Sequence, residues 1–506
     1  MTLILSLLFA LFAASSLLAF SLNGLVAPPV VLAIAVLASG LLVHCIRRSA
    51  AAAGLSLGNG PSGRTIAALA GLSAAVIILS GQAGQLYLNF DWEIRLPLLR
   101  DLATSTWPVG YRIDGVDHVL RAQLGMFALP ALLGDIAGLA RSRAALVLQN
   151  IVVLTLALAL VALLGRTRRE RLILVAVVLL FSGMDALGQT FVNLGEGGAF
   201  RFDHLESWAG IQFSSTITQI FWVPHHGLTG LIAAALYLLW WQGRLPPTAL
   251  IAFVPLMAFW SPLTFLGALP FAAHAMVGAL RDRRGLVWVV AAGALSSLLA
   301  GYAILFLQAG TDNVPFHIGF AKTSLGIEPW WLFRYVGFLA IEILAFVVAV
   351  ALTRSWRPQT STPFVIAVVV LLLCPLAWIG QGEDIVMRVS IPALNVLAVL
   401  VARILIDTPC GPSGRLARRV AVAALAIGAI TPLMEIRRGF VRPLGTVSSS
   451  CSFIDAWADS EWPMTQVSVY LADEARFPAA LRPQVATRLV LADPRKACME
   501  GSWRRP

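Results

Sequence analysis

Residues 3–22 read LILSLLFALFAASSLLAFSL, twenty consecutive residues without a charged side chain. A helix of about twenty apolar residues is long enough to cross the hydrocarbon core of a bilayer. Similar stretches recur along the 506-residue chain, which is 58% hydrophobic and only 12% charged, whereas soluble domains carry about 25% charged residues. The sequence therefore excludes an ordinary soluble protein and predicts an all-α polytopic membrane protein.

The apolar stretches predict thirteen transmembrane helices, at about residues 3–22, 28–46, 66–88, 144–165, 171–188, 226–242, 248–262, 264–280, 286–308, 331–353, 363–381, 388–406 and 419–435. The stretches at 248–262 and 264–280 are short and are interrupted around Ser261-Pro262. A re-entrant hairpin is the alternative there, and it would leave eleven spans. Both ends of such a hairpin emerge on one side, so the sidedness of all other segments is the same in either case.

Arginine clusters indicate how the chain is oriented. With the spans above, the clusters in the short loops all lie on one face: Arg47, Arg48 and Arg64; Arg166, Arg168, Arg169 and Arg171; Arg281, Arg283 and Arg284; Arg354 and Arg357; Arg415, Arg418 and Arg419. Short cytoplasmic loops are enriched in Lys and Arg, so this face is predicted to be the cytoplasmic face of a cytoplasmic (inner) membrane. The N-terminus is then cytoplasmic and the C-terminus periplasmic or extracellular. The net charge of +11 is therefore explained by the arginines of the cytoplasmic loops. It does not indicate a surface that binds nucleic acid, so a nucleic-acid partner is excluded.

The polar chemistry is concentrated on the outer face. Residues 1–435 form the predicted transmembrane domain, with large outer loops at about 89–143, 189–225 and 309–330, and residues 436–506 form a small outer C-terminal cap. Within the first loop, the stretch 116–140 is expected to be an amphipathic helix in the membrane interface. A transporter would place polar residues near the bilayer midplane, where Glu342 is the main charged residue of the predicted spans. Chemistry on an outer substrate is therefore favoured.

The first outer loop opens with Asn89-Phe90-Asp91-Trp92-Glu93. One of the two carboxylates could accept a proton from an attacking hydroxyl group. The two could also hold a divalent cation such as Mg²⁺ or Mn²⁺ through oxygen ligands. The alternative is a solvated helix end that Trp92 anchors at the interface.

Two adjacent histidines, His225 and His226, begin the sixth predicted span. Unpaired backbone N–H groups at a helix start would help them bind a phosphate or a substrate hydroxyl group. Interface anchoring together with Trp222 is the alternative. No HExxH motif or comparable metal-ligand spacing is present.

Arg388 lies just inside the outer end of an apolar stretch. Burial of a positive charge there is energetically unfavourable unless an anionic group pairs with it. A guanidinium group can bind two oxygens of a lipid phosphate at once. The alternative partner is a neighbouring carboxylate, Glu383 or Asp384. Arg201 and Arg334 are weaker candidates for the same phosphate-binding role.

Cys451 and Cys498 are the two cysteines that fall in the predicted outer segments. An oxidising compartment permits a disulfide between them, but their separation in the sequence does not establish it. The chain contains no CxxC motif, which argues against a zinc or iron–sulfur scaffold.

This arrangement resembles the GT-C superfamily of integral-membrane glycosyltransferases, which use polyprenyl-phosphate-linked sugars as donors. Its members carry an acidic pair in the first large outer loop, followed by interfacial helices. The pair maps onto Asp91 and Glu93, and the resemblance extends over roughly residues 66–406. It implies that Asp91 deprotonates the acceptor hydroxyl group while the lipid phosphate leaves the sugar. Arginines near outer helix ends hold that phosphate in the family, and Arg388 is the best match.

The resulting hypothesis is a glycosyltransferase that moves a sugar from a polyprenyl-phosphate carrier to an envelope glycan, lipid or protein, at the outer surface and among membrane lipids. A transporter or flippase, an enzyme of the O-antigen ligase or polymerase type, and a non-catalytic scaffold subunit are the alternatives. Convergence of Asp91, His225 and Arg388 on one outer cavity would favour the transferase. Wide separation of the three residues would argue against it.

Overall fold

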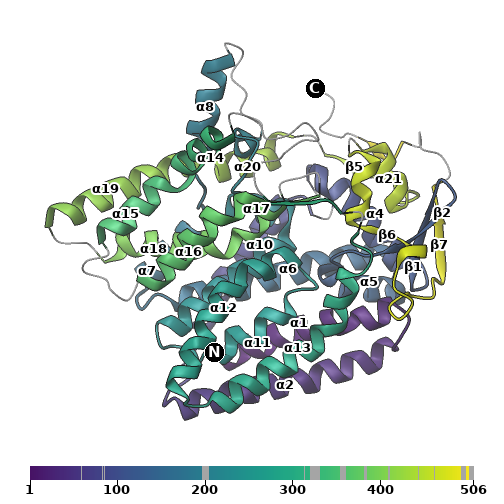
Figure 1. The fold of residues 1–506 in the computed structure, drawn as a ribbon, viewed down its shortest axis with the longest axis horizontal. Coiled ribbons are helices and arrows are strands. Elements are labelled where there is room, and N and C mark those ends of the chain that lie inside the picture. Colours follow the sequence, from purple (N-terminus) through teal and green to yellow (C-terminus); the bar gives the residue numbers. More distant parts are fainter. Residues whose placement is uncertain are drawn as a thin grey trace.

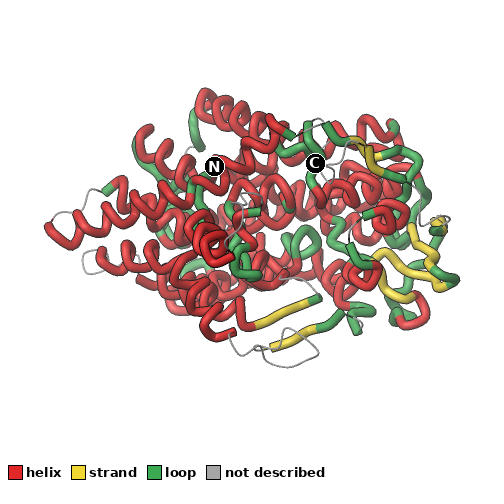
Figure 2. The backbone as a smooth tube through the Cα atoms, turned by 90° about the horizontal axis from the view of Figure 1, so that it is seen from above, coloured by secondary structure: helices red, strands yellow, loops and turns green. Residues whose placement is uncertain are grey.

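The computed structural model describes the chain except residues 59, 83, 85, 197–203, 313, 319–330, 354–360, 381–383, 408–410, 443, 461, 492–496 and 501–506. It is mostly helical, at 72% (Figures 1 and 2). Among the described residues, seven helices are long and apolar enough to cross a membrane, and four further apolar helices are 10–17 residues long. Both findings agree with the predicted class of helical membrane protein.

The first ten helices are α1 (Thr2–Leu22), α2 (Pro28–Ala52), α3 (Gly63–Leu79), α4 (Phe90–Thr104), α5 (Gly125–Ala137), α6 (Leu139–Leu163), α7 (Arg168–Leu179), α8 (Asp185–Glu196), α9 (Thr216–Trp222) and α10 (Pro224–Trp241). The later ones are α11 (Thr248–Leu256), α12 (Pro262–Asp282), α13 (Leu286–Gln308), α14 (Trp331–Leu339), α15 (Ala345–Thr353), α16 (Ser361–Leu373), α17 (Asp384–Val389), α18 (Ile391–Ile406), α19 (Gly411–Gly428), α20 (Ile430–Val441) and α21 (Phe453–Asp459). The strands are β1 (Val109–Ile113), β2 (Val116–Leu120), β3 (Phe316–Ile318), β4 (Ala377–Ile379), β5 (Thr446–Val447), β6 (Leu471–Asp473), β7 (Thr487–Val490) and β8 (Met499–Glu500).

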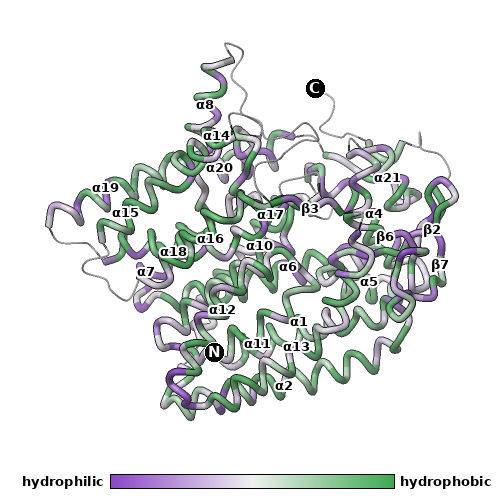
Figure 3. The backbone as a smooth tube through the Cα atoms, viewed as in Figure 1, coloured by the Kyte–Doolittle hydropathy of each residue, from purple (hydrophilic) through white to green (hydrophobic). Residues whose placement is uncertain are grey.

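Helix α10 lies at the centre of the bundle and packs against α6, α12 and α18. Its residues from Pro224 to Leu239 are all buried, because most of its side chains are apolar and other helices enclose it. The N-terminal end of α10 directly follows α9, so the packing of α10 fixes the position of α9 as well. Figure 3 shows that hydrophobic residues dominate the long helices.

Several of the predicted spans are wrong as continuous membrane-crossing helices. The predicted span 363–381 is one of them, because α16 ends at Leu373 after 13 residues and Ala377–Ile379 form β4. Helix α11 has nine residues, and at about 1.5 Å per residue it is too short to cross ~30 Å of hydrocarbon. The predicted span 171–188 is divided, because α7 ends at Leu179 and α8 starts separately at Asp185. Figure 1 shows α8 projecting from the body of the molecule.

The single interfacial helix predicted over 116–140 is also wrong. Its first residues form β2, which pairs antiparallel with β1, and only the later part forms a helix, α5. Asp114 and Gly115 connect the two strands, and both have a positive φ, 48° and 80°. Asp-Gly is a favoured pair for two-residue hairpin turns because both positions require a positive φ.

The hairpin joins the C-terminal segment to the first outer loop. One four-stranded sheet has the order β6-β2-β1-β7, with β6 antiparallel to β2 and β7 parallel to β1. Figure 1 shows these strands together at one end of the molecule, and β3 and β4 form a separate pair. The protein is therefore not purely α-helical, and its C-terminal cap shares a sheet with residues far away in the sequence.

Several of the predicted cytoplasmic arginines come together in the structure. Arg244, after α10, lies close enough to Arg166, Arg171 and Arg403 to interact electrostatically with all three. Arg403 also pairs with Glu170 at 3.7 Å. The ends of α6, α7, α10 and α18 that carry these residues thus lie on a common face, as the loop charges predict.

Candidate functional site

A cavity of about 320 Å³ opens at the end of the bundle that carries the predicted first outer loop. This volume falls within the range of about 300–1,000 Å³ that is typical of ligand sites. Its polar and charged lining residues are Asp91, Arg95, Gln123, His204, Glu206, Ser207, Gln212, Ser214, Thr218, Asp384, Arg388, Glu435 and Gln466. Its aromatic lining residues are Phe90, Trp222, Trp457, Trp462 and Tyr470. We call this space the polar cavity.

Asp91 reaches the polar cavity from the first turn of α4. Asn89 caps this helix by accepting a hydrogen bond from the backbone N–H of Trp92. The Asn89 amide and the Trp92 indole both donate to the carbonyl oxygen of Phe221, at 3.1 and 2.8 Å. These bonds fix the start of α4 against α9, and they therefore fix the position of Asp91.

The Asp91 carboxylate forms an ion pair with Arg95 one turn later, with Oδ2 2.9 Å from Nη2. Arg95 also donates to the carbonyl oxygen of Trp222, so its guanidinium group is held at two points. The Asp91 side chain remains 15% exposed and lines the cavity. The carboxylate is thus oriented by the protein and still accessible to a ligand.

Glu93 does not accompany Asp91 at the polar cavity. It is fully buried and is not among the lining residues, because residues two positions apart on a helix do not share a face. The structure therefore separates the predicted acidic pair, and a cation held jointly by Asp91 and Glu93 does not fit this geometry. Across the described ranges, no group of three or more His, Cys, Asp or Glu side chains is placed to hold a metal ion.

Arg388 and Asp384 enter the polar cavity together from α17. Arg388 Nη1 lies 2.5 Å from Asp384 Oδ1, which is the local ion pair that the sequence offers as one alternative. Asp91 and Tyr470 are also close enough to act on Arg388 electrostatically. Glu383, the other predicted partner, lies outside the described residues.

A second cavity, of about 460 Å³, begins where the first one ends. Its lining is mostly apolar, and one wall comes from α12 and α13, with Pro262, Leu263, Phe265, Leu266, Ile304 and Leu307. Gln123, Asp384, Arg388 and Val469 line both cavities. The Arg388–Asp384 pair therefore stands at the junction between a polar space and an apolar one, which we call the apolar cavity.

The two predicted histidines lie deeper than the polar cavity. Both are 1% exposed, and their rings lie with centroids 3.9 Å apart at an interplanar angle of 43°. His226 Nδ1 is hydrogen-bonded to Ser261 Oγ at 2.6 Å, and His226 lines the apolar cavity. His225 lines neither cavity. Convergence of Asp91, His225 and Arg388 on one cavity would favour a transferase. Asp91 and Arg388 both line the polar cavity, whereas His225 does not.

The two remaining arginine candidates give no phosphate site in the described structure. Arg201 lies outside the described residues. Arg334 donates from Nε and Nη2 to the carbonyl oxygen of Ala209, at 2.9 and 2.8 Å. It thereby fastens α14 to the second outer loop and does not line either cavity.

Glu206 is a site residue that the sequence does not reveal. Its carboxyl group is buried and accepts hydrogen bonds from Gln212, Ser215 N–H and Thr218, at 2.7, 2.9 and 2.6 Å. Burial raises the pKa of Glu206 to about 8, with a further contribution from the nearby negative charges of Asp185 and Glu435. The polar cavity thus contains a carboxyl group whose surroundings favour the protonated form.

The C-terminal segment closes one side of the polar cavity. Trp457, Trp462, Gln466, Val469 and Tyr470 all belong to it and all line the cavity. This arrangement could not be found from the sequence, because it depends on the sheet that joins the segment to the first outer loop.

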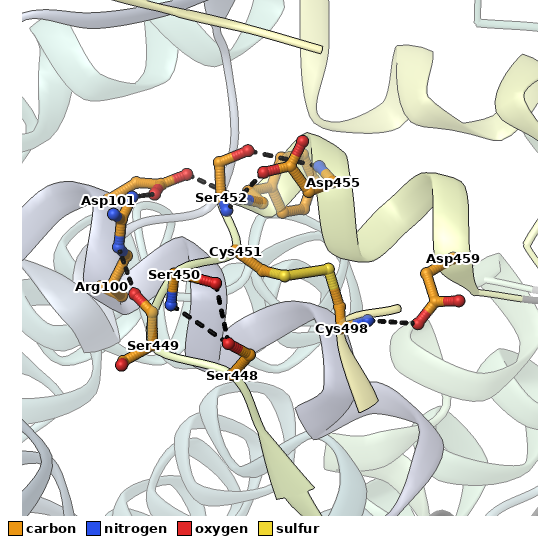
Figure 4. The surroundings of a disulfide bond; sticks show 11 residues. Arg100, Asp101, Ser448, Ser449, Ser450, Cys451, Ser452, Asp455, Asp459 and Cys498 are labelled. Carbon is orange, nitrogen blue, oxygen red and sulfur yellow. Dashed lines mark hydrogen bonds and ion pairs between the residues drawn. A yellow bond between two sulfur atoms is a disulfide. The ribbon is translucent and has the colours of Figure 1, made fainter. Parts of the chain in front are cut away.

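A disulfide and two carboxylates hold this segment in place. Cys451 and Cys498 are bonded across a separation of 47 residues, and Asp459 accepts a hydrogen bond from the backbone N–H of Cys498 at 2.9 Å (Figure 4). Asp101 on α4 accepts from the backbone N–H of Phe453 at 2.7 Å. Burial raises the pKa of Asp101 to about 6. The helix that carries Asp91 is thereby fastened directly to the C-terminal segment.

Comparison with protein-family models, with curated proteins and with solved structures finds no match to this chain.

Proposed function

We propose that this protein is a membrane glycosyltransferase with a GT-C-like arrangement of about eleven to thirteen membrane segments. It transfers a sugar from a polyprenyl-phosphate carrier to a cell-envelope acceptor at the outer face of the cytoplasmic membrane. The observation that supports this proposal best is the meeting of the polar and apolar cavities at Arg388. A polyprenyl-phosphate sugar has the same order of parts: an apolar chain, a phosphate and a polar sugar.

The apolar cavity is the place for the first isoprene units of the carrier. Its wall from α12 and α13 supplies aliphatic and aromatic side chains such as Leu263, Phe265 and Ile304. Burial of apolar surface gives about 25 cal/mol per Å², so a few buried isoprene units are enough to anchor the chain.

Arg388 is the proposed phosphate ligand. Its ion pair with Asp384 engages Nη1, and a guanidinium group has five N–H donors. The remaining donors can bind phosphate oxygens in the fork geometry that favours arginine at such sites. Asp384 then acts as a positioning residue that holds the guanidinium group at the junction.

Asp91 is the proposed general base. Its carboxylate takes the proton of the acceptor hydroxyl group, whose oxygen forms a bond to the anomeric carbon of the sugar. The bond from that carbon to the phosphate oxygen breaks, and polyprenyl phosphate leaves with the electron pair and interacts with Arg388. Arg95 orients the carboxylate through the ion pair of 2.9 Å, because a base must be held within hydrogen-bond reach of the proton that it removes.

The test is a mass-spectrometric profile of envelope lipids and surface glycans from cells with wild-type protein, a deletion, or Asp91→Asn at matched expression. Loss of one sugar in both the deletion and Asp91→Asn, with accumulation of its polyprenyl-phosphate donor, is the expected result.

Asp282→Asn is the matched control. Asp282 is also an aspartate paired with an arginine, Arg284, at 3.6 Å, but it lies at the end of α12 and lines neither cavity. A wild-type profile for Asp91→Asn, alongside a changed profile for the deletion, would contradict the transferase and favour a transporter or scaffold.

A further inference from the structure

The polar cavity has two chemically different sides. Asp91 on α4 and Arg388 on α17 line it from one side, whereas Trp457, Trp462 and Tyr470 line it from the C-terminal segment. Aromatic side chains offer flat apolar faces with polar groups at one edge. Such faces match the C–H surface of a sugar ring, whose hydroxyl groups point outward around the rim.

The remaining lining residues suit those hydroxyl groups. Gln123, Gln212 and Gln466 carry amides that both donate and accept hydrogen bonds, and Ser207 and Ser214 carry hydroxyl groups that do the same. A sugar hydroxyl group also needs partners of both kinds. The apolar cavity has fewer such side chains, because Gln123, Gln308 and Thr311 stand there among mostly apolar residues.

Trp462 is the aromatic residue best placed to meet a sugar at the reaction site. Its ring lies 5.0 Å from the ring of Phe90, the residue before Asp91. On its other side it packs near Trp457, at 6.3 Å between centroids, and Trp457 packs against Tyr470 at 5.5 Å. The side chain of Trp457 is buried, so it supports the wall, while the half-buried Trp462 offers surface to a ligand.

We propose that the C-terminal segment forms the acceptor subsite of the polar cavity, and that the acceptor is a saccharide whose ring stacks on Trp462 next to Asp91. The role of this saccharide as the acceptor rests on the proposed transferase function. The binding of a saccharide to Trp462 is independent of that function. The subsite is assembled only when the C-terminal segment docks through the sheet and through Asp101.

The experiment measures binding of soluble sugars to the full-length protein in nanodiscs by saturation-transfer NMR. The probes are methyl glycosides and short oligosaccharides of hexoses, pentoses and N-acetylhexosamines, with serine- and threonine-containing peptides as the competing class. We expect at least one saccharide to bind, with the strongest transfer to the C–H protons of one ring face, and we expect no peptide to bind.

Trp462→Ala is expected to weaken that binding at least about tenfold, the factor that corresponds to 1.4 kcal/mol. Trp462→Phe keeps an aromatic face and is expected to retain most of the affinity. Trp288→Ala is the matched control, because Trp288 lies on α13 beside Arg48 and lines neither cavity. Formation of the Cys451–Cys498 disulfide shows that each variant has folded its C-terminal segment.

The outcomes separate the two proposals. Binding of no saccharide, binding of a peptide instead, or equal affinity of wild type and Trp462→Ala would overturn the saccharide subsite. Saccharide binding that depends on Trp462, together with an unchanged envelope profile for Asp91→Asn, would keep the subsite and reject the transferase. A changed profile without saccharide binding would keep the transferase and reject the subsite.

Discussion

Arg388 and Asp384 form an ion pair of 2.5 Å at the point where the polar and apolar cavities meet. The two residues are one helical turn apart on α17, so the helix itself sets their geometry. Both side chains are less than one-fifth exposed, and a charge in such a position is stable only when it is paired. An incoming phosphate therefore finds a guanidinium group that is already oriented.

The first prediction concerns the strength of that phosphate site. Arg388→Ala should weaken the binding of farnesyl phosphate to the protein in nanodiscs by about 10- to 100-fold, since hydrogen bonds to charged groups contribute about 1.5–3 kcal/mol. Arg388→Lys should recover only part of this affinity, because an ammonium group cannot bind two oxygens in a fork. Arg334→Ala serves as the control, and equal affinity of Arg388→Ala and wild type would remove Arg388 from the proposed site.

The second prediction concerns the pH dependence of stability at Glu206. Its pKa rises from the ordinary 4.5 to about 8 in the folded protein, so folding favours the protonated form. The contribution of Glu206 to the free energy of unfolding is complete below pH ~4.5 and is lost as the pH rises toward about 8. Glu206→Gln lacks this loss. The melting temperature of the variant, relative to that of wild type, should therefore increase between pH 5 and pH 8.

Glu474→Gln is the control for this comparison, because Glu474 pairs with Arg488 at 2.6 Å outside the cavity. Thermal unfolding in one detergent at a series of pH values gives the measurement. Parallel pH profiles for wild type and Glu206→Gln would mean that the Glu206 carboxyl group is already ionised at pH 7.

The third prediction concerns the anchoring of the C-terminal segment. The bond between Cys451 and Cys498 closes a loop of considerable length, and loss of such a bond costs about 2–4 kcal/mol. Cys451→Ser or treatment with a reductant should therefore increase limited proteolysis between α20 and the C-terminus and lower saccharide binding. Cys374→Ser, which removes a buried cysteine outside this segment, should change neither, and a protease-resistant reduced protein would show that the sheet alone holds the segment.

The class of helical membrane protein could be predicted because each apolar helix is encoded locally. A stretch such as residues 3–22 contains within itself the length and hydrophobicity that a span requires, and α1 covers Thr2–Leu22. Asp91 and Arg388 could also be selected from the sequence. A charged side chain at the edge of an apolar segment is energetically costly, which makes it a candidate for a functional residue. The hairpin at Asp114-Gly115 carried a readable turn signal, but the apolar residues after it favoured one long helix.

The rest of the site depends on contacts between distant segments. Glu206 becomes a buried acid only because Gln212, Ser215 and Thr218 fold around it. Tyr470 reaches Arg388 only because β6 pairs with β2. Neither relationship has a local pattern, so no spacing in the sequence could indicate it.

The fourth prediction concerns the buried acid Glu342. This residue lies on a π-helical turn, Ala340–Leu344, between α14 and α15, and accepts a hydrogen bond from the indole of Trp208 at 2.7 Å. A Cβ atom at Gly183 would lie 1.5 Å from Glu342 Oε2. Gly183→Ala should therefore destabilise the protein by about 1–3 kcal/mol, the usual cost of overpacking, as measured by thermal unfolding in detergent.

Gly71→Ala is the control, because a Cβ there meets no atom within 4 Å and alanine is the better helix former by roughly 0.5–1 kcal/mol. The double variant Gly183→Ala/Glu342→Ala supplies the decisive comparison. Glu342→Ala removes the carboxyl group that the new methyl group would strike, so the two changes together should cost less than the sum of their separate costs. Strictly additive costs would mean that Gly183 and Glu342 are not in contact, and that the π-helical turn is positioned by the Trp208 hydrogen bond without the close approach of Gly183.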